Sequence, residues 1–401
     1  MKRLALFAVC LALYGAALIP ACSAPAKRWF KGNTHTHTLW SDGNGAPEKV
    51  VSFYTESDYD FLVLSDHNRL SEGEHWFPVD GKRLTEEKLA ELIETFGAEA
   101  VEVRDEPRRE MRLQTLDELR ARFEAPGEFL LIQGEEVTDS WEDFPVHINA
   151  INIDKVIEPT HGDSVGDTIR RNMEAITAEA QRSGREVLAH LNHPNFGWGV
   201  TVAEVAAMPL ERFFEVYNGH SSVRNYGDAE HASMDALWDE ALVIRIEDNN
   251  LGMLFGVATD DSHDYYSWGV GKTNPGRGWV MVQAATLEAN DIVRAMKAGD
   301  FYASTGVVLG DVQRGATSIA LKIEAQEGVS YTTQFIGTLR GHGPGEVGVL
   351  LAEKQGTEAS YEFSGEELYV RAKVLSSRDH PNPYAAGDKE VAWIQPVIPA
   401  R

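Results

Sequence analysis

Between residues 29 and 305 the chain alternates short apolar runs with longer amphipathic segments. The apolar runs have the length of buried strands, and the amphipathic segments repeat their apolar residues with the period of a helix. The predicted strands are 61–64, 129–132, 147–151, 186–189, 213–216 and 253–257. The predicted helices between them are 47–57, 85–96, 116–123, 168–182, 234–246 and 287–297. Strands that alternate with helices predict an α/β fold with a mainly parallel sheet, open or closed into a barrel.

The pattern changes after Gly310. From there apolar and polar residues alternate with period two, and Gly, Pro, Asn and Asp separate the runs. The predicted strands are 319–324, 331–336, 347–351, 361–363, 368–374 and 391–394. We therefore expect an α/β domain over 29–308 and a small antiparallel β-sandwich over 312–401.

Residues 1–24 have the features of an export signal. Met1-Lys2-Arg3 precedes an apolar run over 4–19, which is short for a membrane span, and small residues follow it. Ile19-Pro20-Ala21-Cys22 resembles a bacterial lipobox, which would place a lipid on Cys22; ordinary signal cleavage nearby is the alternative. Either reading predicts an exported protein, periplasmic or on the outer surface, whose only membrane contact would be that lipid anchor.

Composition limits the kind of site and partner. The only two cysteines, Cys10 and Cys22, lie in the leader, so a metal ion would have to be held by His, Asp and Glu. The net charge of −25 disfavours nucleic acid as a partner, because such proteins need a basic surface. A small anionic substrate is still compatible with this charge, since bound divalent cations would invert its sign locally.

Ionisable side chains follow nearly every predicted strand of the α/β region. The first strand runs into His35-Thr36-His37, whose imidazoles share one face of an extended segment, with Asp42 close behind. Similar clusters of polar residues follow the later strands, at 65–68, 133–136, 190–195, 217–220 and 258–263. Chemistry in parallel α/β folds collects at these carboxyl ends, so the side chains are candidates for one shared site.

Each of these signals also has a plain structural explanation. His35-x-His37 can be incidental, Asp66-His67 can be a capped turn, Glu135 can be a surface acid and His147 can be a core histidine. Together these explanations would leave partnerless polar residues at nearly every strand end, which is costly. A multi-metal site removes that cost, and its nitrogen and oxygen donors suit Zn, Mn or Fe better than Ca.

The motifs, taken in order, resemble those of the polymerase-and-histidinol-phosphatase (PHP) superfamily of metal-dependent phosphoesterases. They are His35-x-His37 with Ser41-Asp42-Gly43, Ser65-Asp66-His67-Asn68, Gly134-Glu135-Glu136, His147, His193-Pro194-Asn195 and Asp261-Ser262-His263. The resemblance spans about 30–305. The leader, the run 114–136, the segment 215–220 and the β-rich tail are similar to the exported carbaryl-hydrolase-like branch.

The resemblance implies a distorted (β/α)7 barrel of PHP type that holds two to three divalent metal ions. The implied ligands form three sets, with Glu135 shared by the first two: His35, His37, Glu135 and Asp261; Glu135, His147 and His193; and Asp42, His67 and His263. Asp42 stands where some relatives have His, so occupancy of the third site is an open question.

We expect the site to hydrolyse an ester of a small molecule, with a phosphomono- or diester favoured. Two ions that share a carboxylate would lower the pKa of a bridging water and supply hydroxide near neutral pH. His263 and His220 are the candidate acids for the leaving group, unless a metal ion serves instead, and Asp66 would orient a neighbouring ligand. Three candidates for a phosphate-binding cation at the rim, each of which a solvated surface charge would also explain, are Arg69, Arg224 and Arg277.

Two alternatives stay open at the level of sequence. The same ligands would polarise a carbonyl group as well, so a carboxyl or carbamate ester is the alternative substrate. An exported binding protein with a structural metal site is the alternative of another class. The charged insertion over 71–126 either covers the cleft or forms a solvated face.

Overall fold

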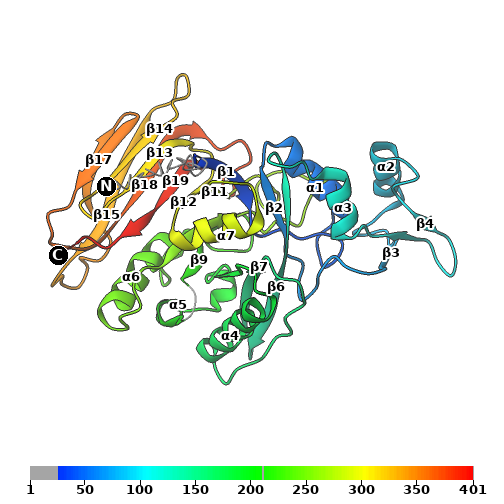
Figure 1. The fold of residues 1–401 in the computed structure, drawn as a ribbon, viewed down its shortest axis with the longest axis horizontal. Helices are drawn as coiled ribbons and strands as arrows, with labels where there is room; N and C mark the ends of the chain where they lie inside the picture. Colours follow the sequence, from blue (N-terminus) through cyan, green and yellow to red (C-terminus); the bar gives the residue numbers. More distant parts are fainter. Residues whose placement is uncertain (1–25, 210–211, 401) are drawn as a thin grey trace, which may run out of the picture.

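The computed structural model describes residues 26–209 and 212–400. The predicted export signal and Cys22 lie outside these residues. Within the described part, no helix is both long and apolar enough to cross a membrane. The chain forms an elongated mixed α/β molecule, with the C-terminal strands at one end and a small helical and β-stranded extension at the other (Figure 1).

A 13-stranded sheet runs through the molecule. Its strands, in spatial order, are β10 (Phe255–Thr259), β9 (Phe213–Asn218), β8 (Leu188–Leu191), β7 (Phe144–Ile151), β6 (Leu130–Trp141), β2 (Phe61–Leu64), β1 (Arg28–Asn33), β11 (Trp279–Ala284), β12 (Phe301–Ser304), β19 (Lys389–Val397), β18 (Glu367–Asp379), β15 (Tyr331–Leu339) and β16 (Val349–Gln355). Two three-stranded sheets accompany it. They are β3 (Trp76–Pro78), β5 (Glu110–Arg112) and β4 (Val103–Arg104), and β13 (Leu309–Arg314), β14 (Ser318–Ile323) and β17 (Glu358–Glu362).

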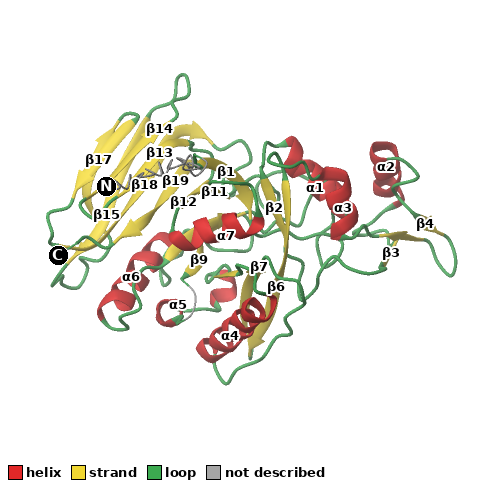
Figure 2. Cartoon of the chain, in the orientation of Figure 1, coloured by secondary structure: helices red, strands yellow, loops and turns green. Residues whose placement is uncertain are grey.

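Helices alternate with the strands through the α/β region, as predicted (Figure 2). They are α1 (Pro47–Glu56), α2 (Glu86–Phe96), α3 (Leu116–Phe123), α4 (Val165–Ser183), α5 (Val202–Ala207), α6 (Met234–Glu247) and α7 (Ala289–Ala298), with a 3-10 turn η1 (Phe196–Trp198). Thr115 caps α3 in a reciprocal capping box with Glu118. α2 and the sheet β3-β5-β4 build the extension from the predicted insertion (Figure 1).

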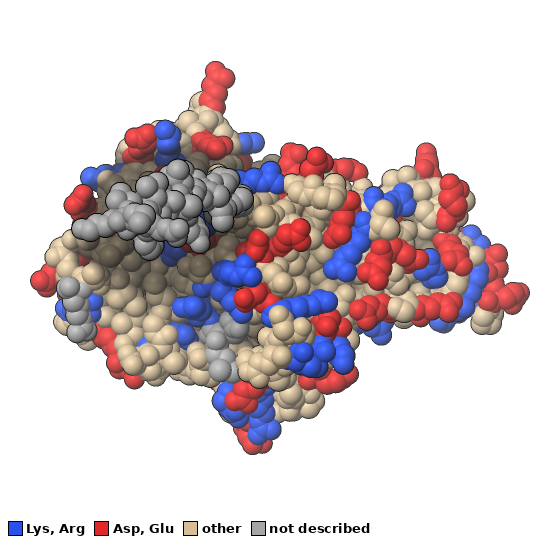
Figure 3. Space-filling model, viewed as in Figure 1, with Lys and Arg blue, Asp and Glu red and all other residues tan. Residues whose placement is uncertain are grey.

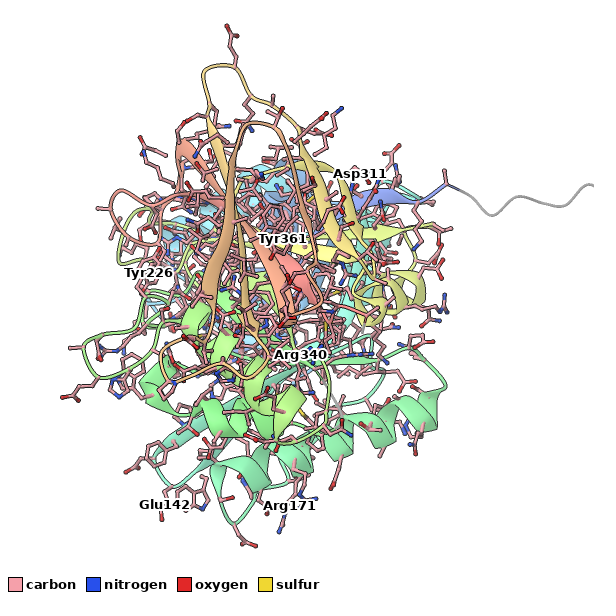
Figure 4. The ribbon with its side chains drawn as sticks, turned by 90° about the vertical axis from the view of Figure 1, so that its left-hand side faces the viewer. Glu142, Arg171, Tyr226, Asp311, Arg340 and Tyr361 are labelled. Carbon is pink, nitrogen blue, oxygen red and sulfur yellow. The ribbon has the colours of Figure 1, made fainter. Side chains whose placement is uncertain are left out.

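The sheet is mixed, which corrects the prediction of a mainly parallel one. β1, β2 and β6 run parallel, as do β8, β9 and β10. β7 is antiparallel to both of its neighbours, and β11 is antiparallel to β1. The cause at β7 is the short turn between Trp141 and Phe144, because a chain that reverses in two residues can only pair antiparallel. Glu142 of this turn and Arg171 of α4 lie at the same edge of the molecule (Figure 4).

The described residues show no ladder between β10 and β11, so the structure does not show a closed barrel. A side chain covers part of the free edge of β10. The Gln395 amide donates to the carbonyl of Gly256 at 2.7 Å and accepts from its N–H at 2.9 Å. Gln395 therefore satisfies β10 as a neighbouring strand would.

The strands β15, β16, β18 and β19 join the main sheet, so the predicted separate sandwich is not confirmed. β12 pairs with β19 at Tyr302↔Ile394 and its neighbours, which carries the sheet across the expected boundary. One buried cluster lies between these strands and the sheet β13-β14-β17. In the view onto this end, Tyr361 of β17 lies in front of the other strands (Figure 4). The strands are stabilised both by packing on a second sheet and by pairing to the α/β region.

Candidate metal centre

The centre begins where β1 ends. Beyond β1, Thr36 forms a parallel bridge to Ser262, which lies beyond β10. The N–H of His37 donates to the Ser262 carbonyl at 3.1 Å, and the N–H of Asp261 donates to the His35 carbonyl at 3.0 Å. These bonds fix the two histidines beside Asp261, and the Nε2 atoms of His35 and His37 lie 3.1 Å apart.

Glu136, and not Glu135, supplies the central carboxylate, which corrects the assignment made from the sequence. Both residues are buried in β6. The Oε1 of Glu136 lies 3.0 Å from His147 and 3.3 Å from His193, and its Oε2 lies 2.8 Å from His67 and 3.3 Å from His37. Glu136 therefore faces imidazoles on both of its oxygens.

Glu135 lies on the other face of the strand, because side chains alternate along an extended backbone. Its Oε1 accepts from the N–H of Ile157 at 2.6 Å, and its Oε2 has no hydrogen-bond partner among the described residues. Burial raises the pKa of Glu135 to about 8. It is absent from the ligand groups of the described chain.

Every other predicted ligand lies in the cluster. Four overlapping groups place their donor atoms close enough to share an ion: His37, Asp42, His67 and His263; His35, His193 and Asp261; His35, His37 and Glu136; and His67, Glu136 and His147. His67 thus belongs to two groups, where the sequence predicted one, and His147 stands beside it.

The spacing of the donors fits bound divalent ions. His35 Nε2 lies 3.3 Å from Asp261 Oδ1 and 3.4 Å from Glu136 Oε1, and His37 Nε2 lies 3.2 Å from Asp261 Oδ1. Metal–ligand bonds of about 2.0–2.2 Å set tetrahedral neighbours about 3.3–3.6 Å apart. Several neutral imidazoles with two or three carboxylates also match the donor set of Zn, Mn or Fe.

Hydrogen bonds outside the ligands fix which nitrogen faces the cluster. The Nδ1 of His35 donates to Glu215 at 2.7 Å, and the Nδ1 of His263 donates to the carbonyl of Asp261 at 2.9 Å. When the ring is neutral, each Nε2 therefore has its lone pair directed to the centre. Glu215 also accepts from the N–H of His193 at 2.8 Å, so one buried carboxylate positions two ligands.

The charges of the centre depend on one another. Burial alone would raise the pKa of Glu136 and Asp261, but the surrounding imidazoles hold both well below the usual range. Burial alone would lower the pKa of His35, yet the nearby carboxylates raise it well above the ordinary value. Ions must therefore displace protons from this cluster, which makes metal binding weaker at lower pH.

The backbone at two ligands is unusual. His193 has φ 24° and Asp261 has φ 46°, both in the left-handed region that non-glycine residues rarely adopt. Each lies two residues beyond the end of a buried strand, His193 after β8 and Asp261 after β10. Such strain collects at functional sites, where the surroundings hold it in place.

Of the three predicted catalytic residues, His263 lies among the ligands and the other two surround them. Asp66 accepts from the N–H of Thr38 at 2.8 Å and from the hydroxyl of Ser41 at 2.5 Å, so it holds the loop that carries Asp42. His220 accepts at Nδ1 from the N–H of Ser222 at 3.1 Å, which leaves the hydrogen on Nε2. Its ring lies 5.1 Å from that of His263, at the rim of the cluster.

The three predicted rim cations have different surroundings. Arg69 lines a cavity together with Asp42 and His67. Arg224 lies over the Trp198 ring, 5.2 Å from its centroid. Arg277 is fully buried and donates to backbone carbonyls on three loops, so it is neither a rim cation nor a surface charge.

No protein family and no curated protein matches the sequence. A two-domain Bacteroides vulgatus protein containing a predicted PHP-like metal-dependent phosphoesterase matches 95% of this chain and 100% of its own, with 16% identity and a TM-score of 0.39. A putative metal-dependent phosphoesterase from Bifidobacterium adolescentis matches 66% of this chain and 94% of its own, with 14% identity and a TM-score of 0.32.

An amidohydrolase from Chromobacterium violaceum matches 58% of this chain and 87% of its own, with 14% identity and a TM-score of 0.28. With TM-scores below 0.5, these similarities establish neither an activity nor a substrate.

Proposed function

We propose that this chain is a metal-dependent hydrolase of small-molecule esters, with phosphoesters as its substrates. The observation that carries the proposal is the position of Glu136, whose two oxygens face His35, His147 and His193 on one side and His37 and His67 on the other. A carboxylate so placed can be shared between two ions. Two or three divalent ions would be held by the four overlapping groups.

The ions would supply a water of lowered pKa and a Lewis acid for the substrate oxygen. The chain supplies the rest. Glu215 keeps His35 and His193 in position, and Asp66 fixes the loop of Asp42. Burial lowers the pKa of His220 to about 4, so its ring is neutral at pH 7 and offers Nε2–H as a hydrogen-bond donor to a leaving group.

The cluster can act without a nucleophilic side chain. Cysteine is absent after Cys22, and ions held by the ligand groups would supply an activated water. Water is therefore the proposed nucleophile. We assign the leader over 1–24 to export, so that the reaction takes place outside the cytoplasm; fractionation of cells that express the chain and its Cys22→Ser variant tests this assignment.

Parallel assays with p-nitrophenyl phosphomonoesters, phosphodiesters and carbamates test the function, on protein purified without chelator and analysed for metal. We expect phosphoester turnover that chelation removes and metal restores. The His35→Ala/His37→Ala variant should fold and lose turnover, whereas a His161→Ala/His231→Ala control, outside the ligand groups, should keep it. If only the carbamates are hydrolysed, carbamate esters take the place of phosphoesters as the substrate class. Bound metal without hydrolysis of any ester would favour a binding protein.

A further inference from the structure

A cavity of about 530 Å³ opens beside the metal centre, with Asp42 and His67 in its wall. This volume falls within the range of small-ligand sites. Part of the wall comes from the extension that carries β3, with His75 and Arg83 among the lining residues. The insertion therefore contributes to the site, instead of being only a solvated face.

Two arginines from separate segments converge on one loop at this cavity. Arg69, which follows the Asp66-His67 motif, donates from Nη1 to the carbonyl of Trp40 at 3.2 Å. Arg83, from the extension, donates to the carbonyl of Ser41, the next residue. These carbonyls directly precede Asp42. Each guanidinium has five N–H donors and uses one in these bonds, so others are left for a ligand.

Aromatic rings support this arrangement. The Arg83 guanidinium lies 4.7 Å from the centroid of the Phe77 ring, and the rings of Trp40 and His75 stack at 5.2 Å. The Trp40 indole is itself fixed, because its N–H donates to the Gln114 carbonyl at 3.0 Å. Planar rings beside a guanidinium are suited to a flat organic group that carries an oxyanion.

The charges at the cavity point to an anionic ligand. Neither Arg69 nor Arg83 forms an ion pair with any residue of the described chain. This holds although the sequence as a whole has 62 acidic residues against 37 lysines and arginines. Asp42 is the one acid in the cavity wall, and it belongs to the metal groups. Two guanidiniums without carboxylate partners remain available for bidentate bonds to an oxyanion.

We propose that Arg69 and Arg83 form a subsite for a second oxyanion on the substrate, attached to the flat group that leaves or remains after hydrolysis. The inference rests on the proposed function and specifies its substrate class: an ester that carries a carboxylate or a further phosphate beyond the scissile bond. The metal centre takes the reacting group, and the arginines take the second charge.

Equilibrium binding of model products tests the subsite without turnover. Calorimetry on the metal-loaded protein would compare 4-hydroxybenzoate with the neutral 4-hydroxybenzamide, and 4-hydroxyphenylphosphonate would report a phosphate-type oxyanion. The wild type should bind 4-hydroxybenzoate or the phosphonate at least about tenfold more tightly than the amide. The larger of the two ratios identifies the oxyanion.

The Arg69→Gln/Arg83→Gln variant, with metal content matched to the wild type, should bring both ratios to about one. Arg109→Gln is the matched control, because Arg109 is an arginine of the same extension that pairs with Glu86 and Asp105 away from the cavity. It should keep the wild-type ratios. Ratios near one in the wild type, or ratios that survive the double substitution, would overturn the subsite.

The failure of the subsite and the failure of the proposed function are distinguishable. Product binding does not require catalysis, so a protein that hydrolyses no ester can still show arginine-dependent binding. If the protein hydrolyses phosphoesters but binds charged and neutral products equally well, the subsite is refuted and the proposed function is retained.

Discussion

Glu135 and Glu136 are neighbours in β6, yet their carboxylates serve opposite sides of the strand. Glu136 faces the imidazoles of the centre, whereas Glu135 accepts from the Ile157 N–H on the other side. The alternation of side chains places Glu136 among imidazoles and leaves Glu135 buried without a cationic partner among the described residues. The imidazoles hold the pKa of Glu136 well below its usual range despite its burial. Burial raises the pKa of Glu135 to about 8.

Removal of the charge that supports His35 should weaken metal binding without unfolding the chain. Glu215→Gln retains the shape of the side chain but loses the carboxylate that accepts from His35 Nδ1 and the His193 N–H. We expect metal affinity to fall about 10- to 100-fold, as for other groups that orient ligands. Competition with a chromogenic chelator measures this, and Glu240→Gln, exposed on α6, is the control. Unchanged metal affinity in Glu215→Gln would show that Glu215 does not position the ligands.

Glu48 should make stability depend on pH. It is buried in α1 with an Oε2 that has no partner among the described residues, and burial raises its pKa from 4.5 to about 7. The folded chain therefore holds this proton more tightly than the unfolded chain. The stabilisation is present below pH 4.5 and is lost as the pH rises through 7, at up to about 1.4 kcal/mol per unit.

Glu48→Gln should remove this loss. Relative to the wild type, its free energy of unfolding should rise between pH 4.5 and about pH 7 and then level off, as measured by urea denaturation at each pH. Glu56→Gln, at the exposed end of α1, should run parallel to the wild type. Parallel curves for Glu48→Gln and the wild type would contradict the account.

A buried ion pair links α6 to the C-terminal strands. Arg371 of β18 donates from Nε and Nη2 to the two oxygens of Asp239, at 2.7 Å each. Arg371→Leu leaves the acid buried without its partner, and we expect a loss of about 3–5 kcal/mol in the free energy of unfolding. Lys322→Ala breaks the exposed pair with Glu358 and should cost less than about 1 kcal/mol. Equal losses in urea titrations would contradict a structural role for the buried pair.

Several elements follow from local sequence. β2 occupies the predicted residues 61–64, and α3 the predicted 116–123, because the apolar run and the capping box are complete local signals. β6 shows the limit of that reasoning: it was predicted over 129–132, but it continues to Trp141. The added residues include Gln133, Glu136 and Asp139, whose polar side chains interrupt the apolar pattern. The prediction therefore ended the strand too early.

The ligands were predictable as a set, because histidines and acids recur at strand ends. Which of Glu135 and Glu136 faces the centre depends on the register of β6, and this register is set by pairing with β7. One local signal was available. Val137 packs in the core, and period two places Glu135 on its face and Glu136 on the opposite one. Local sequence could not give Glu215 a role, since its bond to His35 joins residues far apart in the chain.

The metal content of two neighbouring variants shows which of the two glutamates holds the ions. Glu136→Gln and Glu135→Gln make the same chemical change one residue apart in β6, and elemental analysis after equilibration with Zn or Mn counts the ions bound per chain. We predict that Glu135→Gln keeps the wild-type content and turnover, while Glu136→Gln loses at least one ion and about 100-fold or more of the turnover. Full metal content in Glu136→Gln, with loss in Glu135→Gln, would contradict the assigned centre.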